Sequence, residues 1–205
     1  MTDTSQDVDA LEPKAAVAVV KIARQSLELF LRQDVFYHPD LSELPAELTA
    51  PGSSFVTITN RGKLRGCMGN TEARYALAND IARNAISAAS RDFRFAPVTA
   101  AELIDVRLEV TILTVPVPLP YHSYDELVTM LKPGVHGVIL TSGNRKGLLL
   151  PQVWDRLPEP DRFLEMIALK AAIPAGDLRD APPSVDVHTF RAHHYSELGY
   201  REPGS

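Results

Sequence analysis

The sequence contains one cysteine, Cys67, among 205 residues. A single cysteine excludes an intramolecular disulfide and any zinc site built on several cysteines. It suits a reducing compartment. No apolar run approaches the roughly 20 residues that span a bilayer. Residues 1–12 are polar and acidic, so we expect no signal peptide either. We therefore expect a cytoplasmic protein with no membrane partner.

Positive charge and cofactor motifs are also lacking. The 21 lysines and arginines are fewer than the 26 aspartates and glutamates, so the formal net charge is −5, and the basic residues are scattered. We therefore expect no nucleic acid partner. The chain has no GxGxxG, Walker A or CxxxCxxC motif, and the adjacent His193 and His194 would point to opposite faces of a strand. These absences predict no bound nucleotide, cluster or metal ion, and hence no cofactor.

The segments that are present alternate between helical and strand patterns. Apolar positions recur near helical spacing over residues 14–33, which predicts a long helix. β-branched residues beside a turn signal predict a hairpin over residues 54–69. The further expected elements are a helix over 70–89, a strand over 106–112, a short helix over 123–131, a hairpin over 137–150 closed by 151–154, a helix over 161–172 and a strand over 185–195. The second helix is expected to bury Ile81 and to expose Asp80. This order predicts an α+β fold, with antiparallel or mixed sheets and helices packed on one face.

The stretch Leu-Arg-Gly-Cys-Met-Gly, on the returning arm of the first hairpin, holds the cysteine. Side chains alternate along a strand, so we expect Lys63, Arg65 and Cys67 on one face and Leu64 and Met68 on the core face. A cation near a thiol stabilises the thiolate. Cys67 is therefore a candidate catalytic nucleophile or redox-reactive thiol. The alternative is a small buried hydrophobe on a covered strand.

Two further residues are candidates for proton transfer. Glu109 lies on the polar face of the strand over 106–112, where it is either a general base or the ion-pair partner of an arginine. His136 lies in a glycine-rich turn, where it is either the base for the Cys67 thiol, with Glu109 orienting the imidazole, or an exposed loop histidine.

Several residues are candidates for binding a substrate. Arg65 would bind a carboxylate or phosphate with its planar guanidinium, or else form a structural ion pair with Glu109 or Asp92. The other candidates are Gly66, Gly69, Arg91, Asp92, Gln152 and Trp154. The two glycines would let a substrate approach backbone N–H groups. The Arg91–Asp92 pair would line a cleft or cap the second helix. Trp154 would stack on a planar ligand or cover the core.

Residues 64–69 resemble the LRGCIG signature of the AMMECR family, with Met68 in place of the usual Ile. The resemblance continues through residues 84–95, 108–110, 133–137 and 147–154, and it covers roughly residues 14–200. It implies an α+β domain of two lobes that form a cleft, with residues 1–13 as a disordered tail and 201–205 as a C-terminal tail. The most similar type is the prokaryotic AmmeMemoRadiSam system protein A, whose members are associated with a Memo-like protein and a radical SAM protein.

These residues leave three functions open. The first is an enzyme of small-molecule metabolism, in which Cys67 acts on an anionic substrate in a cleft lined by the 64–69 strand. The second is a non-catalytic protein that binds a ligand or another protein in the same cleft. The third is an accessory to a radical SAM and Memo-type system. The reactivity of the Cys67 thiol separates the first hypothesis from the other two.

Overall fold

The computed structural model describes residues 10–174, 176–180 and 183–197. The chain divides into two compact units, Met1–Leu113 with His193–Ser205 and Thr114–Ala192. Each unit contains its own sheet and its own hydrophobic core, and the predicted α+β fold is confirmed. Within the described residues, no helix combines the length and the apolar character needed to cross a membrane.

The predicted tails lie mostly outside the described residues. Of the predicted N-terminal tail 1–13, the structure describes residues 10–13. Leu11 packs against the first core, its N–H donates to the Tyr195 hydroxyl over 3.0 Å, and Pro13 begins the first helix. Residues 11 and 13 of the predicted tail therefore take part in the first unit, and residues 1–9 and 201–205 lie outside the described residues.

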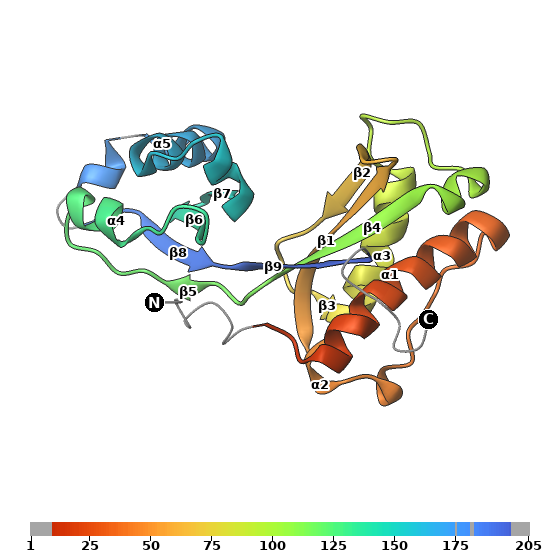
Figure 1. Ribbon diagram of the computed structural model, residues 1–205. Helices are drawn as coiled ribbons and strands as arrows, with labels where there is room; N and C mark the ends of the chain where they lie inside the picture. Colours follow the sequence, from red (N-terminus) through yellow and green to blue (C-terminus); the bar gives the residue numbers. More distant parts are fainter. Residues whose placement is uncertain (1–9, 175, 181–182, 198–205) are drawn as a thin grey trace, which may run out of the picture. The chain divides into compact units, whose positions relative to one another are not determined.

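The first unit is a sheet covered by helices on one face (Figure 1). Its strands follow the order β2 (Lys63–Gly69), β1 (Pro51–Asn60), β4 (Val106–Leu113) and β9 (Ala192–Ser196), and the short β3 (Tyr75–Ala76) pairs with the start of β1. The main helices are α1 (Pro13–Gln33) and α3 (Leu77–Ser90), with a short α2 (Ala46–Thr49) between α1 and the sheet strands. Alternate strand residues such as Val56, Ile58 and Leu108 are buried together with side chains of α1 and α3. In the described part of this unit, no helix covers the opposite face, which we call the open face.

The first hairpin forms as predicted, but a β-bulge changes which side chains share a face. Ile58 pairs with Gly66 while Thr59 pairs with Leu64, so Arg65 is the extra residue of the bulge. A one-residue shift moves the following side chains to the other face of the sheet. Leu64 therefore lies on the face of Cys67 and is 44% exposed. The prediction that Leu64 is buried and that Lys63, Arg65 and Cys67 share a face is wrong.

The second helix begins later than predicted. Helix α3 starts at Leu77, because Asn70 instead accepts the Glu72 N–H in a local turn and Tyr75 pairs with Gly52. The predicted core position Ile81 is buried, but Asp80, expected outside, is buried too. The Asp80 carboxylate accepts hydrogen bonds from the Ser54 N–H and hydroxyl, at 2.8 and 2.7 Å. Buried polar groups need such partners, so this aspartate ties α3 to β1.

The second unit is an antiparallel sheet with two helices. Its strands follow the order β5 (Val117–Pro118), β8 (Asp186–Phe190), β6 (Gly137–Ser142) and β7 (Arg145–Leu149). Its helices are α4 (Tyr124–Met130) and α5 (Pro160–Ala171). Two predictions fail here. Residues 185–195 form two strands in two different sheets, β8 and β9, and Pro151–Asp155 is a 3₁₀ helix rather than a strand end.

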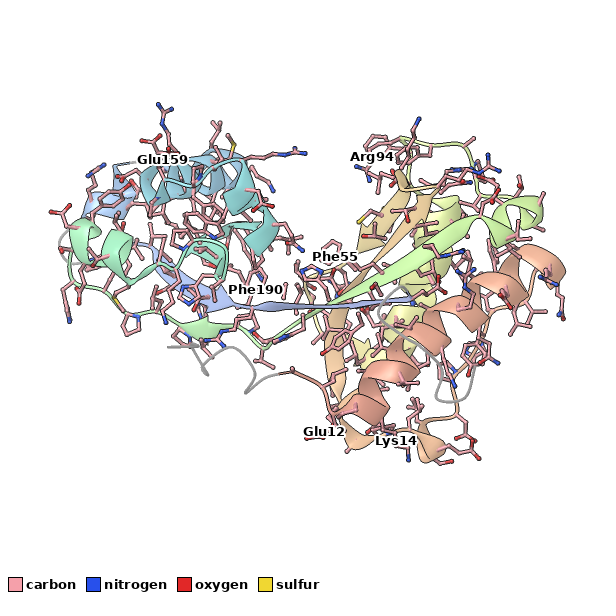
Figure 2. The ribbon with its side chains drawn as sticks, viewed as in Figure 1. Glu12, Lys14, Phe55, Arg94, Glu159 and Phe190 are labelled. Atoms are coloured by element: carbon pink, nitrogen blue, oxygen red, sulfur yellow. The ribbon has the colours of Figure 1, made fainter. Side chains whose placement is uncertain are left out.

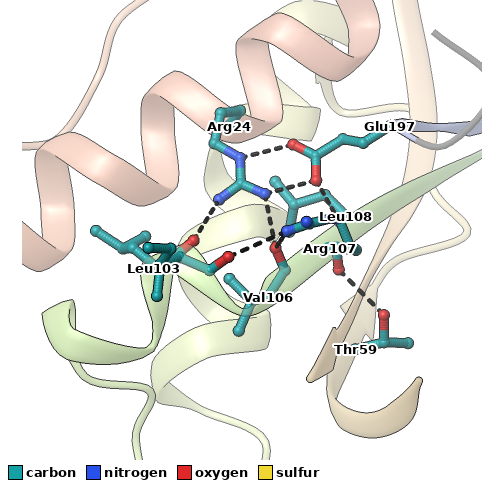
Figure 3. Close-up of polar contacts among 8 residues, drawn as sticks. Arg24, Thr59, Leu103, Val106, Arg107, Leu108 and Glu197 are labelled. Carbon is teal, nitrogen blue, oxygen red and sulfur yellow. Dashed lines mark hydrogen bonds and ion pairs between the residues drawn. The ribbon is translucent and has the colours of Figure 1, made fainter. Parts of the chain in front are cut away.

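A partly buried ion pair fixes α1 to the edge of the first sheet (Figure 3). The Arg24 guanidinium donates to both carboxylate oxygens of Glu197, at 2.6 and 2.5 Å, and to the Val106 carbonyl at 3.0 Å. Glu197 also accepts the Leu108 N–H at 3.0 Å. These bonds join α1, β4 and the residue that follows β9, so they hold the end of β9 against this sheet.

Candidate functional site

A row of three side chains crosses the open face of the first sheet. The strand register pairs Cys67 with Thr57 and Thr57 with Glu109, so one residue from each of β2, β1 and β4 lies in the row. The half-buried Cys67 thiol accepts a hydrogen bond from the Thr57 hydroxyl, at 3.3 Å from oxygen to sulfur. Neighbouring strands are about 4.8 Å apart, so the Cys67 and Glu109 backbones are roughly 10 Å apart. Two of the three predicted catalytic residues therefore face the same side.

The row continues with a histidine that the sequence did not single out for catalysis. His194 on β9 lies with its Nδ1 3.5 Å from Glu109 Oε1 and 3.0 Å from the Thr111 hydroxyl oxygen. Both the imidazole and the Glu109 carboxylate are partly exposed. Glu109 was predicted to be a general base or the partner of an arginine, and the pairing of β4 with β9 brings a histidine to it. A carboxylate beside an imidazole can accept, hold and return a proton.

The cation near the Cys67 thiol is Arg94. Its side chain, on the loop after α3, is labelled in Figure 2. The Cys67 N–H donates to Asp92 Oδ2 at 2.9 Å, and the same carboxylate accepts two hydrogen bonds from Arg94, at 2.9 and 2.6 Å. These Arg94 hydrogen bonds hold the pKa of the buried Asp92 carboxyl well below its usual range, with a smaller contribution from the Cys67 N–H. The pKa of Arg94 is raised mainly by Asp92 and further by the nearby Cys67.

This arrangement changes the roles expected for the Arg91–Asp92 pair. Asp92 was predicted to bind substrate or to cap α3, but its carboxylate is buried and bonded to Cys67 and Arg94, so it positions the strand and the cation. Arg91 is exposed, and its N–H donates to the Ser87 carbonyl at the end of α3. Between them and Arg94, Phe93 has 96% of its surface exposed. Phe93 and Arg94 lie in the stretch 84–95 that resembles the family, but no periodic pattern in the sequence indicated them as site residues.

Arg65 is occupied by contacts within the protein. Its Nε and Nη2 donate to the two carboxylate oxygens of Glu102, at 2.8 and 3.2 Å. Its Nη1 and Nη2 also donate to the carbonyls of Ala96 and Pro97, at 2.6 and 3.1 Å. The hydrogen bonds from Arg65 lower the pKa of Glu102 to about 2. We therefore assign Arg65 a structural role, and its ion-pair partner is Glu102 rather than Glu109 or Asp92.

The two glycines of the motif are explained by close packing. A Cβ added at Gly66 would lie 2.1 Å from the Ala88 carbonyl oxygen, so β2 can approach α3 only without a side chain there. A Cβ at Gly69 would lie 2.4 Å from both the Phe55 ring and the Ser54 carbonyl oxygen. The approach of a substrate is not needed to account for either glycine.

The remaining predicted site residues, His136, Gln152 and Trp154, belong to the second unit. Trp154 is 3% exposed, stacks on Phe163 with ring centroids 3.7 Å apart, and donates its Nε1–H to the His136 carbonyl at 2.6 Å. It therefore covers the core rather than binding a planar ligand. The half-buried His136 accepts the N–H of Lys132, and its pKa is lowered first by burial and then by Lys132 and Arg191. Gln152 lies exposed on the 3₁₀ helix.

The described residues contain no group of three or more histidine, cysteine, aspartate or glutamate side chains arranged to hold a metal ion.

The open face offers a thiol, a hydroxyl, a carboxylate–imidazole pair and a guanidinium. These groups suit nucleophilic attack with proton transfer on a substrate that carries negative charge.

Comparison with known proteins identifies the family of this chain. A protein of Methanothermobacter thermautotrophicus is 37% identical over 187 residues, which cover 88% of this chain and 93% of the relative. The protein Mbar_A1807 of Methanosarcina barkeri is 42% identical over 164 residues, which cover 76% of this chain and 78% of the relative. The crystal structure of the uncharacterized protein PH0010 from Pyrococcus horikoshii is similar, with a TM-score of 0.73 and 30% identity over 87% of this chain and 89% of that one. The sequence model of the AMMECR1 family matches residues 20–195, and the chain belongs to this family.

Proposed function

We propose that this chain is a cysteine-dependent enzyme that acts on a small anionic metabolite at the open face of the first sheet. The observation that carries the proposal is the row Cys67–Thr57–Glu109–His194, in which a thiol and a carboxylate–imidazole pair share one face. Arg65, Gly66 and Gly69 have structural explanations, whereas the Cys67 thiol is free and only half-buried. A free thiol also suits the reducing cytoplasm.

The chemistry follows from the spacing of these groups. The Cys67 thiolate forms a C–S bond with an electrophilic carbon of the substrate, and Arg94 stabilises the thiolate and attracts the substrate's negative charge. The Glu109–His194 pair begins two strand spacings from Cys67, roughly 10 Å away, so its protons travel through the intervening Thr57 hydroxyl and bridging water. Along this path His194 supplies the proton with which the departing group leaves the attacked carbon. Water then attacks the same carbon and gives its proton back to the pair, and the C–S bond breaks, which releases the product and restores the Cys67 thiolate.

The first test measures the reactivity of the thiol. Alkylation of the native protein by iodoacetamide at pH 7 should be about tenfold faster than that of N-acetylcysteine. Arg94→Gln should slow it, whereas Arg61→Gln should not, because Arg61 lies at the hairpin turn and pairs with Asp105. A thiol that reacts only after unfolding, or no faster than N-acetylcysteine, would refute the proposal.

The second test measures turnover with two aryl esters of matched leaving group, p-nitrophenyl acetate and the anionic p-nitrophenyl hemisuccinate. Cys67→Ser should abolish hydrolysis of both esters. Glu109→Gln and His194→Asn should lower kcat/KM by about 100-fold while the alkylation rate stays unchanged. Arg94→Gln should reduce the preference for the anionic ester. Equal hydrolysis by the wild type and Cys67→Ser would show that this face is not catalytic.

One observation favours a second candidate function, the recognition of another protein. Phe93 is 96% exposed beside Arg94, and exposed aromatic and arginine side chains are frequent anchors of protein interfaces. The family resemblance names a Memo-like protein and a radical SAM protein as partners of this type. Pull-down with each purified partner, comparing Phe93→Ala with the matched exposed control Leu169→Ala, tests this function. Loss of capture in Phe93→Ala alone, together with an unreactive thiol, would favour the accessory role.

A further inference from the structure

The first unit contains a second polar site, separate from the thiol row. A pocket of about 520 Å³ is formed by Phe36 near the start of the α1–α2 connection, by residues 70–75 and by one face of α3. Cys67, Glu109 and His194 do not line it. A volume of this size fits a small metabolite, since ligand pockets commonly occupy about 300–1,000 Å³.

One face of α3 presents a regular polar stripe to this pocket. Arg83, Ser87 and Arg91 recur at intervals of four residues, and all three line the cavity. Residues four apart lie on the same side of a helix, one turn above the other. The Arg83 guanidinium and the Ser87 hydroxyl from α3, and the Arg91 guanidinium from the residue that follows its last turn, therefore line the same side of the pocket. Arg74, which follows the turn at residues 70–72, adds a third guanidinium to the lining.

The charges of the lining are unbalanced toward the positive. Three arginines face two carboxylates, those of Glu72 and Asp80, which leaves a formal charge of +1 in a chain whose net charge is −5. Asp80 is buried and its carboxylate accepts hydrogen bonds from Ser54, Asn70 and Asn84. Within the described part of the chain, Glu72 forms an ion pair with Arg74. Arg83 lies near enough to Asp80 for its charge to act on that carboxyl, but neither Arg83 nor Arg91 forms an ion pair among the described residues. Their guanidinium groups are positioned to meet an external anion.

Two exposed aromatic rings line the same pocket. Phe36 is 55% exposed and Tyr75 is 46% exposed, although large aromatic side chains are usually well covered. The Arg83 guanidinium lies 4.7 Å from the centre of the Tyr75 ring, which holds both side chains in place. An aromatic surface beside a cationic stripe suits a ligand that has a flat apolar part and a charged part.

We propose that this pocket binds a phosphate ester that carries a planar ring, of which a nucleoside monophosphate is the simplest form. Arg83 and Arg91 hold the phosphate, because guanidinium binds phosphate oxygens in a bidentate manner. Phe36 and Tyr75 contact the ring. The absence of Walker A and GxGxxG motifs is consistent with this mode, since these motifs bind phosphate through backbone N–H groups and this pocket uses side chains.

Isothermal titration calorimetry of the full chain tests the proposal with four probes: adenosine 5′-monophosphate, ribose 5-phosphate, adenosine and orthophosphate. The monophosphate should bind most tightly. Ribose 5-phosphate, which lacks the ring, should bind about tenfold more weakly, as one aromatic stacking contact predicts. No heat from the monophosphate at millimolar concentration would overturn the proposal. Equal affinity for the monophosphate and ribose 5-phosphate would overturn the proposal that Phe36 and Tyr75 contact the planar ring of the ligand.

Variants identify the site and exclude a general charge effect. Arg91→Ala and Arg83→Gln should each weaken binding of the monophosphate by about tenfold or more. Arg61→Ala is the matched control, because Arg61 is also an exposed arginine but pairs with Asp105 outside the pocket. Phe36→Ala should weaken the monophosphate and leave ribose 5-phosphate unchanged. Weakening by Arg61→Ala equal to that by Arg91→Ala would refute the site. Cys67→Ser should bind normally, since the pocket is independent of the thiol.

Discussion

The two units have similar architecture but use their unusual side chains differently. Each combines a sheet with helices and closes its own core. In the second unit, Trp154 lies in that core, where it stacks on Phe163 and donates its Nε1–H to the His136 backbone carbonyl. In the first unit, Cys67 and Glu109 remain partly exposed on a sheet face. Arg65 forms structural hydrogen bonds with Glu102 and with the loop after α3. A residue type that can carry chemistry therefore indicates function only where packing leaves its reactive atoms accessible.

The largest expected effect tests the structural role of Trp154. Trp154→Ala removes the ring that stacks on Phe163 and should destabilise the second unit by about 3–5 kcal/mol. Hydrogen exchange should accelerate in β6 and β7, while the alkylation rate of Cys67 under native conditions stays the same. If hydrogen exchange accelerates in β1 and β2 as much as in β6 and β7, Trp154 does not stabilise the second unit alone.

The next effect is a pH dependence in the first unit. The hydrogen bonds from Arg65 lower the pKa of Glu102 from 4.5 to about 2, so the unfolded state binds this proton more readily than the folded state. The stabilisation is fully present above pH 4.5 and is lost as the pH falls toward 2. It corresponds to roughly 2–3 kcal/mol at most, because the carboxylate is partly exposed and solvent screens the pair. Urea unfolding at pH 7 and pH 3 measures most of it, since pH 3 still lies above the folded-state pKa.

Two variants check this assignment. Glu102→Gln should remove that part of the pH dependence, and Arg65→Gln should remove it as well because the cation is lost. If the free energy of unfolding depends on pH in both variants as it does in the wild type, the structural role of Arg65 is contradicted and its role as an anion-binding residue is open again.

The third effect compares two glycines, one in each unit. Gly66→Ala places a Cβ against the Ala88 carbonyl oxygen and should destabilise the first unit by about 1–3 kcal/mol. Gly176→Ala is the control, because a Cβ there meets no atom within 4 Å. Thermal unfolding measures both variants. An unchanged midpoint in Gly66→Ala would show that this glycine is not required for packing.

The smallest effect concerns the hydrogen bond to the thiol. Thr57→Val removes the hydroxyl that donates to Cys67 Sγ while keeping the shape of the side chain. The rate of alkylation by iodoacetamide should fall about threefold, the size expected for one weak hydrogen bond. Ser42→Ala, on the exposed turn after α1, should leave the rate unchanged. A faster reaction in Thr57→Val would show that the hydroxyl protects the thiol instead of supporting it.

Local patterns predicted much of the fold. The helix over 14–33 appears as Pro13–Gln33, and the hairpin over 54–69 appears as β1 and β2. These elements depend on residues that are close in the sequence, so periodicity and turn residues reveal them. The predicted start of the second helix was wrong, because Tyr75 and Ala76, which suit a helix, instead form β3 and pair with β1.

The candidate site was predicted only in part, because its residues meet through long-range pairing. Cys67 and Glu109 were chosen from the sequence, whereas His194 was considered only as a metal ligand. No local pattern shows that residues 192–196 pair with β4, nor that the strand predicted over 185–195 would divide between two sheets.

The sequence by itself determined the chemical groups that are available: one thiol, few histidines, and an alternating strand that carries Glu109. The tertiary structure decided their neighbours. The bulge at Arg65 set which side chains share a face with Cys67, and the loop after α3 supplied Arg94 in place of Arg65 as the nearby cation. The physical reason is that strand register has a period of two, so one extra residue reverses which side chains can meet.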